Sequence, residues 1–356
     1  MPYVLATRTT HIQFSFIMEN KEVVDIVYLW VDGGDPVWRQ KRRRAMVQQG
    51  LVGGDGLAVY ANVEGRFRDN QELRYSLRAL EQFFPGHGHI YIVTDGQVPD
   101  WLAARSGVTV IDHRELIPAA ALPTFDSGHI ETYIHHIANL SERYFYFNDD
   151  VFFGAPVRLG DWFWPGGVYV AWSDECEVSN EAMRQDATAL ENACRLSIGW
   201  LIRQDQAEQD SDDMVCVAAQ AYQPTFRTFA HAPRPMLRSM LYQLEAVAPE
   251  LFAMSRSTVF RAWDKPTIVS DFVLRWALQN GLGKVRSYAH LHVSTGEISD
   301  DGKSVLLELL SDRVGALQFF CINDTTDDAH HDDPRLTRVL TVLQQMMPQP
   351  SRFERA

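Results

Sequence analysis

Carboxylate side chains follow three apolar runs of this sequence. Asp32 follows the run 23–31, Asp95 follows 89–94, and Asp149 and Asp150 follow 144–147. Carboxylate oxygens are the ligands that Mg²⁺ and Mn²⁺ prefer, and such an ion can bridge two phosphates. An isolated Asn-Asp-Asp string, however, is more often a solvated turn. The chemistry therefore depends on the elements that position these acids.

The apolar runs are typical of buried strands, and helical periods separate them. Leu73, Leu77 and Leu80 predict a helix that opens with a capping box formed by Asp69 and Glu72. The other predicted elements are a strand at 108–112, a helix marked by Ile130, Ile134 and Ile137, mostly helical structure over 235–280, and a final helix from Asp333-Pro334 to before Pro348. Strands alternating with helices predict an α/β fold with a mostly parallel, Rossmann-like sheet and a helical C-terminal part. Ligands of such sheets bind beyond the carboxyl ends of the strands, where these acids stand.

Composition narrows the function classes. The 356 residues include 33 Lys+Arg and 46 Asp+Glu, and the formal charge of −13 argues against a nucleic-acid binder. The cysteines are Cys176, Cys194, Cys216 and Cys321, and their wide spacing argues against a disulfide scaffold or a zinc site. Residues 1–22 are predicted to be a tail without the features of a signal peptide or a membrane span, so we expect a cytoplasmic protein with at most peripheral membrane contact.

Five strings of the sequence together are distinctive. They cover residues 25–32, 66–78, 90–99, 122–127 with Ile130-Glu131, and 146–150. Together they closely resemble the Stealth family, which contains bacterial capsular polysaccharide phosphotransferases and the catalytic subunit of the animal lysosomal-enzyme N-acetylglucosamine-1-phosphotransferase. Two residues depart from the family pattern: Asp126 replaces a usual Asn, and His136 replaces a usual Arg.

The resemblance implies one catalytic domain over 23–347, followed by a short tail at 348–356. The four family blocks fall at about 24–36, 66–157, 230–277 and 320–354. The stretch 158–229 matches no block, and we expect it to contribute to the choice of acceptor.

The resemblance also implies a reaction. A hexose-1-phosphate unit, with N-acetylglucosamine-1-phosphate as the first expectation, moves from a UDP-sugar to a glycan hydroxyl and UMP is released. The product is a phosphodiester-linked capsular or exopolysaccharide. We expect Mg²⁺ or Mn²⁺ as the cofactor, and the donor and the glycan acceptor as small-molecule partners. Capsule-assembly proteins or a second copy of the chain are further expected partners, in the cytoplasm or at the inner face of the plasma membrane.

The family match assigns roles to residues. Catalytic roles fall to Glu131, Asp150, His231 and Arg261. Substrate-binding roles are predicted for Asp32, Arg66, Asp69, Arg74, Asp95, Asn148 and Asn323, and metal-binding roles for Asp149, Asp150 and Asp324. Arg261 would clamp phosphate oxygens, and either His231 or Asp150 would accept the proton of the acceptor hydroxyl. Without the family, His231 reads as a structural histidine, Arg261 as a surface ion pair and Asp69 as a helix cap.

Two other function classes remain open from the sequence. A metal-dependent glycosyltransferase of the glycosyltransferase-A-like type has the same kind of sheet and a carboxylate pair, but transfers only the sugar and releases UDP. A catalytically inactive glycan-binding or assembly protein would need none of the acids. The joint presence of Arg66, His231 and Arg261 favours transfer of the phosphate together with the sugar.

Overall fold

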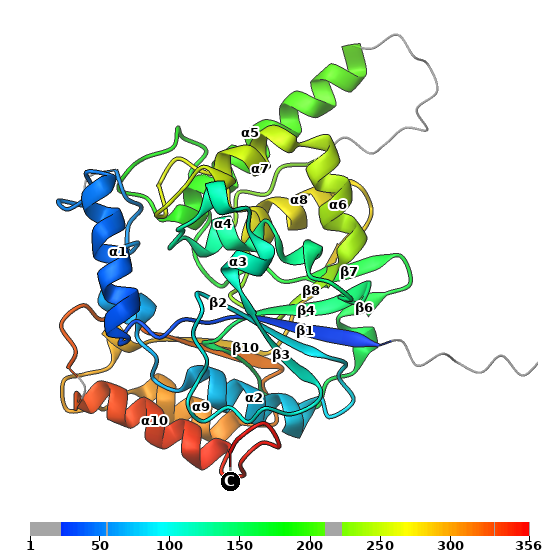
Figure 1. Cartoon of the computed structure of the whole chain (residues 1–356). Coiled ribbons are helices and arrows are strands. Elements are labelled where there is room, and N and C mark those ends of the chain that lie inside the picture. The colour runs from blue at the N-terminus through cyan, green and yellow to red at the C-terminus, as the bar shows by residue number, and fades with distance from the viewer. Residues whose placement is uncertain (1–22, 55, 211–222, 331, 356) are drawn as a thin grey trace, which may run out of the picture.

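The computed structural model describes residues 23–54, 56–210, 223–330 and 332–355 (Figure 1). The predicted tail at 1–22 and Cys216 lie outside the described residues. Within them, no helix is both long enough and apolar enough to cross a bilayer.

A five-stranded sheet with the order β3-β2-β1-β4-β8 forms the centre of the protein. Its strands are β1 (Val24–Leu29), β2 (Ile90–Thr94), β3 (Val108–Asp112), β4 (Arg143–Asn148) and β8 (Arg234–Leu237). The first four run parallel, and only β8 runs antiparallel, beside β4. The predicted mostly parallel α/β fold is therefore confirmed, and the three acid-bearing ends of β1, β2 and β4 meet at one edge.

Two smaller sheets extend the centre. One has the order β10-β11-β5, with β10 (His290–Ser294), β11 (Phe319–Asn323) and β5 (Val151–Phe153). The other has the order β6-β7-β9, with β6 (Phe163–Trp164), β7 (Gly167–Val170) and β9 (Gly283–Val285).

Helices cover both faces of the central sheet (Figure 1). One side holds α2 (Glu72–Phe83), α9 (Val305–Arg313) and α10 (Pro334–Met346). The other side holds α3 (His113–Leu116), α4 (Ser127–Glu131), α5 (Ala189–Asp210), α6 (Arg238–Val247), α7 (Pro249–Arg256) and α8 (Val273–Gln279). Helix α1 (Pro36–Gln48) stands at one side of the sheet.

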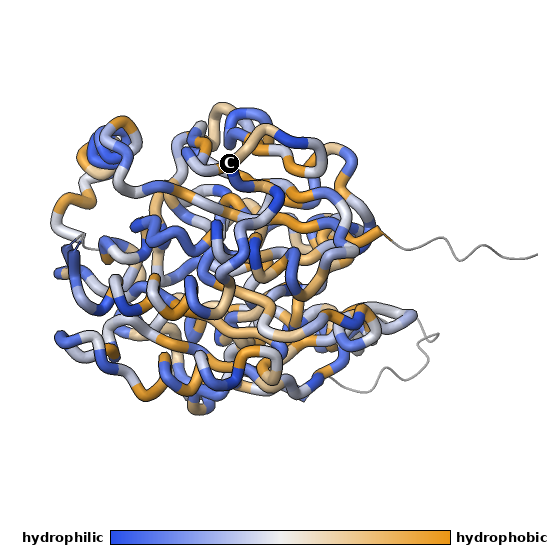
Figure 2. The backbone as a smooth tube through the Cα atoms, turned by 90° about the horizontal axis from the view of Figure 1, so that it is seen from below, coloured by the Kyte–Doolittle hydropathy of each residue, from blue (hydrophilic) through white to orange (hydrophobic). Residues whose placement is uncertain are grey.

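The sequence explains the central layer. All six residues of β1 are buried, as expected for a parallel strand covered on both faces. Leu73, Leu77 and Leu80 of α2 are fully buried, and the hydroxyls of Tyr28 and Ser76 join β1 to α2 over 2.9 Å. Figure 2 shows the hydrophobic segments running through the interior, with hydrophilic segments concentrated at the periphery.

Two local predictions were wrong. The capping box at Asp69 does not form: α2 begins at Glu72, after Gln71 in a left-handed conformation (φ 67°), and Asp69 Oδ1 instead accepts a hydrogen bond from the Gln71 N–H over 2.9 Å. The helix predicted around Ile130–Ile137 is broken into α4 and a separate turn, Ile134–His136. The segment after His231 forms the edge strand β8, where Pro235 needs no ladder hydrogen bond.

The C-terminal segment 348–355, predicted to be a tail, packs against the protein. Phe353 is fully buried, and the Glu354 carboxylate accepts hydrogen bonds from Arg74 and Arg78 of α2 at 2.5 to 2.8 Å. These ion pairs lower the pKa of Glu354 to about 2, although burial acts in the opposite direction. The segment is therefore an integral part of the fold.

Candidate active site

A cavity opens at the carboxyl edge of the central sheet. Eight predicted site residues line it: Arg66, Asp95, Asn148, Asp149, Asp150, His231, Asn323 and Asp324. The parallel strands bring most of them together, as expected from topology. Helix α1 and the loop before α2 close one side with Trp38 and Phe67.

Strand β4 places a polar row along one face because alternate residues of a strand point the same way. The Tyr146 hydroxyl lies 2.8 Å from Glu131 Oε1 and 2.9 Å from Asn148 Oδ1, so it can donate its proton to either. The Asn148 amide nitrogen in turn lies 3.2 Å from His231 Nε2. Glu131 is thus connected to His231 through two side chains of β4.

His231 and Asp150 form the polar centre of the cavity. His231 Nε2 lies 3.2 Å from Asp150 Oδ1, and the thiol of Cys321 on β11 faces Asp150 Oδ2 at 3.5 Å. Burial raises the pKa of Asp150. The charge and hydrogen bond of His231, together with the Cys321 thiol, lower it by more, so the pKa lies below its ordinary value. An ionised Asp150 beside an imidazole is an arrangement that can orient the ring and stabilise its protonated form.

Asp149 has the opposite environment from Asp150. Burial is the largest cause, and the nearby carboxyls of Asp150, Glu72 and Asp69 add to it, so the pKa of Asp149 is raised well above its ordinary value. The pKa of Glu72 is also raised, to about 8, by burial and by Asp69. Neighbouring carboxyls with separated pKa values are characteristic of functional sites.

Two guanidinium groups meet at Ser127, and of the two only Arg66 lines the cavity. Arg66 and Arg261 both donate to the hydroxyl of Ser127, Arg66 over 3.2 Å. Burial lowers the pKa of Arg66 to about 9, and the charge of Arg261 adds to the effect. Two cations held together in this way favour an anionic ligand, and phosphate oxygens suit their planar donor pattern.

Asp126 explains how Arg261 is held. Its Oδ1 lies 3.3 Å from Arg261 Nε and also accepts a hydrogen bond from the Gly128 N–H at the start of α4. Its Oδ2 accepts one from the Thr258 hydroxyl over 2.8 Å. The Asp at this position, a departure from the family pattern, therefore supplies both a helix cap and a counter-charge.

Asp95 lies at the end of β2 with one oxygen engaged. Its Oδ1 pairs with Lys41 of α1 and lies 3.7 Å from His113 Nδ1, whereas its buried Oδ2 has no hydrogen-bond partner among the described residues. Burial lowers the pKa of His113 to about 4. The unengaged oxygen is available to a ligand hydroxyl or amide.

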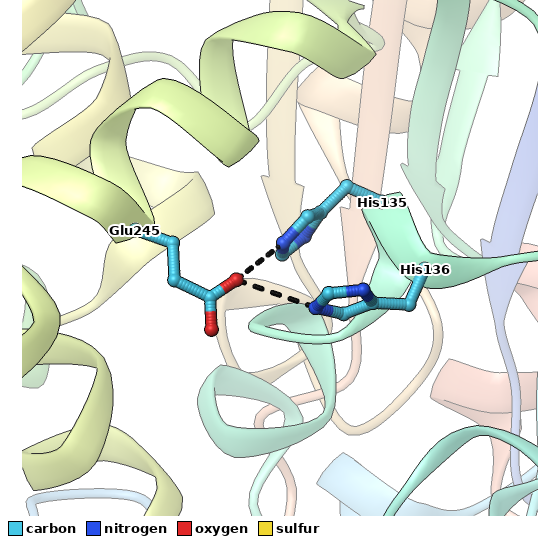
Figure 3. Close-up of side chains that lie close together, drawn as sticks. All are labelled: His135, His136 and Glu245. Atoms are coloured by element: carbon cyan, nitrogen blue, oxygen red, sulfur yellow. Dashed lines mark hydrogen bonds and ion pairs between the residues drawn. The ribbon is translucent and has the colours of Figure 1, made fainter.

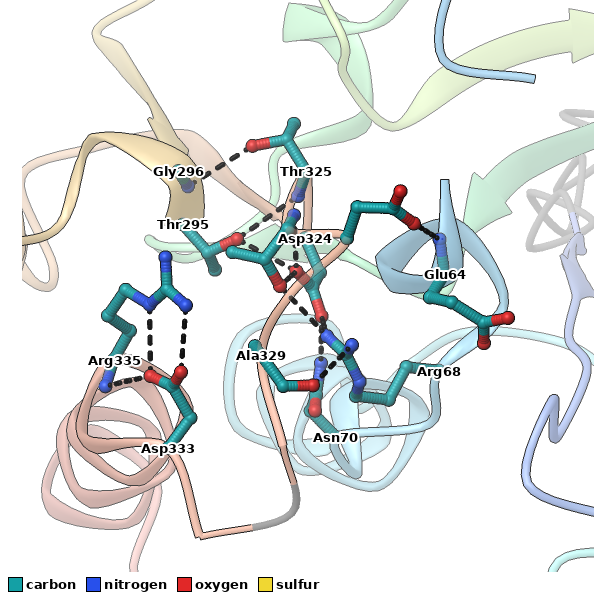
Figure 4. A network of polar contacts seen from close by, with 12 residues as sticks. Glu64, Arg68, Asn70, Thr295, Gly296, Asp324, Thr325, Ala329, Asp333 and Arg335 are labelled. Carbon is teal, nitrogen blue, oxygen red and sulfur yellow. Dashed lines mark hydrogen bonds and ion pairs between the residues drawn. The ribbon is translucent and has the colours of Figure 1, made fainter. Parts of the chain in front are cut away.

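Asp324 lines the cavity but is fully engaged (Figure 4). Its Oδ1 accepts from the Thr295 hydroxyl and from the backbone and hydroxyl of Thr326, at 2.7 to 3.0 Å. Its Oδ2 accepts from Arg68 and from Asn70. Burial raises the pKa of Asp324, but these donors bring it below its ordinary value. The contacts give Asp324 the role of joining the loop before α2 to the segment after β11, which places Asn323 at the wall.

Five predicted site residues do not line the cavity: Glu131, Arg261, Asp32, Asp69 and Arg74. Glu131 and Arg261 still contact it indirectly, Glu131 through Tyr146 and Arg261 through Ser127, whereas Asp32, Asp69 and Arg74 have other partners. Asp32 Oδ1 accepts a hydrogen bond from Gly34 over 2.7 Å and shapes the turn after β1. Asp69 holds the turn before α2, and Arg74 faces Glu354 and Gln71. The geometry gives these three residues structural contacts.

The predicted neighbours Glu131 and His135 are separated. Glu131 faces Tyr146, whereas His135 Nε2 lies 2.7 Å from Glu245 Oε2, which also faces His136 at 3.3 Å (Figure 3). This group has the composition of a metal site. However, a metal-bound His135 would need an acceptor for its buried Nδ1, and none lies among the described residues. The group is better explained as a hydrogen-bonded link between the Ile134–His136 turn and α6.

The donor set at Asp149 and Asp150 fits a divalent cation. Asp149 lies among like charges that a cation would offset, and carboxylate oxygens suit Mg²⁺ or Mn²⁺. Asp150, His231 and Cys321 also bring one oxygen, one nitrogen and one sulfur within 4.8 Å, a set that suits a softer ion. Asp324 fits less well because both its oxygens are engaged.

Sequence reasoning missed several residues of the site: Lys41, Glu72, Asp126, Ser127, Tyr146 and Cys321. Tyr146 could have been found from strand alternation, because it lies two residues before Asn148. Cys321 could not, because its contact with Asp150 spans 171 residues of sequence.

The fold and the cavity define an α/β protein of the glycosyltransferase-A-like type, with an Asp–His pair and a partly buried arginine in one cavity at the carboxyl edge of its sheet. The family model for Stealth protein CR2, conserved region 2, matches residues 66–170, and that for Stealth protein CR1, conserved region 1, matches residues 22–48. The chain thus contains two regions that are similar to conserved regions of Stealth proteins.

Curated relatives extend the likeness over most of the chain. An exopolysaccharide phosphotransferase of Streptomyces coelicolor is 35% identical over 340 residues, which cover 93% of this chain and 52% of that protein. The exopolysaccharide phosphotransferase of Mycobacterium tuberculosis H37Rv is 31% identical over 336 residues, covering 93% of this chain and 58% of the relative. That of Nocardia farcinica is 31% identical over 336 residues, covering 93% and 61%. The chain thus spans little more than half the length of these relatives.

Proposed function

We propose that this protein is a phosphotransferase of polysaccharide synthesis that moves hexose-1-phosphate from a UDP-sugar to a glycan hydroxyl and releases UMP. The observation that carries the proposal is one cavity lined by Arg66, Asp150 and His231, with Arg261 donating to the lining residue Ser127. The names of the relatives agree with a phosphotransferase.

The reaction needs a base for the acceptor hydroxyl. His231 takes the proton on its other ring nitrogen, Nδ1, while the acceptor oxygen attacks the phosphorus next to the sugar, and the ionised Asp150, which faces Nε2, stabilises the imidazolium that forms. The new bond is phosphorus to acceptor oxygen. The bond that breaks joins this phosphorus to the oxygen bridging to the UMP phosphate, and UMP leaves with the electron pair.

The arginine pair provides charge stabilisation. Negative charge shifts toward the bridging oxygen and the oxygens of the transferred phosphate, and guanidinium groups fixed by Ser127 and Asp126 meet it without reorganisation. The charge of Arg261 acts on the Glu131 carboxyl, which also accepts a hydrogen bond from the Tyr146 hydroxyl. We assign Glu131 a role in holding the donor sugar. Sugar-only transfer would place the developing charge on UDP and leave the anomeric bond as the one that breaks.

We assign the divalent cation to Asp149 and Asp150. A bound ion would supply further charge neutralisation for the diphosphate. Mg²⁺ or Mn²⁺ binding is testable without turnover, by calorimetric titration of the wild-type protein and of Asp149→Asn. Loss of binding in the variant is expected, and equal binding in both would overturn the assignment.

UDP-N-acetylglucosamine is the first donor to test. The protein is incubated with a panel of UDP-sugars, neutral oligosaccharide acceptors and divalent ions, and the released nucleotide is identified by chromatography. UMP supports the proposal, and UDP would establish a glycosyltransferase instead. We also propose action in the cytoplasm, which the free thiols of Cys176, Cys194 and Cys321 support.

A further inference from the structure

Helix α1 is strongly basic in an otherwise acidic chain. It contains Arg39 and the run Lys41-Arg42-Arg43-Arg44 and has no acidic residue, whereas the whole chain has a formal charge of −13. Arg39, Lys41, Arg43 and Arg44 are exposed. Such a concentration of one charge on one exposed helix needs an explanation beyond solubility.

The helix lies directly against the candidate active site. Its buried Trp38 lines the active-site cavity and packs against Phe125, and its Lys41 pairs with Asp95, another lining residue. Arg42 stacks over Phe67, with its guanidinium carbon 4.5 Å from the ring centroid. One face of α1 therefore forms the wall of the cavity.

The other face of α1 borders a second groove, which we call the α1 groove. It is lined by Arg39, Arg42, Arg43 and Asn62, and it shares Trp38 and Phe67 with the active-site cavity. Arg39 pairs with Glu64 over 2.7 Å, but no ion pair among the described residues involves Arg43 or Arg44. Arg39 and Arg43 lie one helical turn apart, about 6 Å along the axis, so they present charge along the groove.

We infer that the α1 groove binds the phosphodiester backbone of the growing glycan. The inference rests on the proposed function, because only transfer of sugar phosphate makes an acceptor with one negative charge per repeat. A polyanion leaving the cavity past Trp38 and Phe67 would meet Arg39 and Arg43, while a neutral acceptor would gain nothing there. Charge complementarity therefore favours the phosphodiester-linked glycan as the occupant of the α1 groove.

An anionic membrane surface is the main competing occupant, and α1 fits it less well. Helices that lie in a membrane interface present Trp, Phe or Leu toward the lipid. The only tryptophan of α1 is buried, and its exposed apolar residues are Val37 and Val47. The lipid interpretation predicts a different result in the test below.

The test compares Arg43→Glu, at an exposed arginine that lines the groove, with Arg105→Glu, a control that makes the same charge change at an exposed arginine elsewhere. The acceptors are oligosaccharides of equal length, one linked by phosphodiesters and one by neutral glycosidic bonds. For the α1 variant we expect the KM of the charged acceptor to rise about tenfold at low salt, with kcat at saturation retained. High salt should remove the difference. An equal rise for the neutral acceptor, or the same rise in the control variant, would overturn the inference.

Binding without turnover separates this inference from the proposed function. Fluorescence anisotropy with labelled inorganic polyphosphate should show salt-dependent binding to the wild-type protein and binding about tenfold weaker to the α1 variant. Equal binding to both proteins would overturn the inference even if the enzyme releases UMP. If the variant instead lost binding to phosphatidylglycerol vesicles, with polyphosphate affinity and acceptor KM unchanged, the helix would be a membrane contact. If the wild-type protein released only UDP, the failure would lie with the proposed function.

Discussion

Two groups of acids on the same cavity wall have opposite environments. Both oxygens of Asp324 are engaged by donors from Arg68, Asn70, Thr295 and Thr326. Asp150, in contrast, faces one imidazole nitrogen and one weakly donating thiol, and Asp149 faces other carboxyls. The supply of hydrogen-bond donors, rather than residue type or position, therefore separates a structural carboxylate from one that is free to act on a ligand.

The largest expected effect is at the reactive group. His231→Ala and Asp150→Asn should each lower kcat about 1000-fold, because the acceptor hydroxyl loses its base or the charge that supports it. The measurement is the rate of nucleotide release, with circular dichroism to confirm folding. His136→Ala is the matched control, since this half-exposed histidine contacts Glu245 away from the cavity. A folded His231→Ala protein with more than a tenth of wild-type kcat would contradict the assignment.

The same contrast between a residue that acts on a ligand and a structural residue applies to two arginines, Arg261 and Arg74. Arg261→Ala should lower kcat/KM for the donor about 100-fold, because a charge-assisted phosphate contact is lost. Arg74→Ala should change donor kcat/KM by less than about threefold, because Arg74 pairs with Glu354 outside the cavity. Steady-state kinetics with varied donor measures both. Equal losses in the two variants would mean that the sequence-based assignment of Arg74 to the donor was right.

Asp324 should affect stability more than chemistry. Asp324→Ala should lower the free energy of unfolding by about 2 kcal/mol at pH 7, because Arg68 and the loop donors lose their acceptor. The pKa of Asp324 is lowered in the folded protein, so its contribution is present above the unfolded-state pKa and is lost as pH falls through the folded-state pKa. Urea unfolding of both proteins at pH 7 and at low pH measures this. If the difference grew on acidification, the account of Asp324 would be wrong.

The smallest expected effect concerns the Cys321 thiol, a weak hydrogen-bond donor that faces Asp150. Cys321→Ser replaces the thiol that faces Asp150 with a stronger donor, which should lower the pKa of Asp150. The acid limb of the pH profile of kcat should then move about half a unit to lower pH, and Cys321→Ala should move it the other way. Profiles that coincide for the three proteins would show that the thiol does not influence Asp150.

Much of the fold was predictable because its signals are local. Each parallel strand is a continuous apolar run, and parallel strands necessarily bring Asp95 and Asp149-Asp150 to one edge. The start of α10 at Asp333-Pro334 is likewise a local signal, and it was correct. The break between α4 and the Ile134–His136 turn was not predictable from the spacing of isoleucines alone.

The sequence did not predict which polar residues are free to contact a ligand and which are structural, because this depends on partners that are far away in the sequence. Arg68 meets Asp324 across 256 residues of sequence, and Arg74 meets Glu354 across 280. The chain composition gave only a net charge, which hides the basic surface of α1. Such contacts are set by packing, and packing is absent from local patterns.

The central claim is that phosphate travels with the sugar. The direct measurement uses UDP-N-acetylglucosamine labelled with ³²P in the phosphate next to the sugar, or the labelled form of whichever UDP-sugar the panel identifies as donor. After turnover, the glycan and the nucleotide are separated and counted. The account predicts that the label is in the glycan and that the nucleotide is unlabelled UMP. Label recovered in UDP, with an unlabelled glycan, would contradict it.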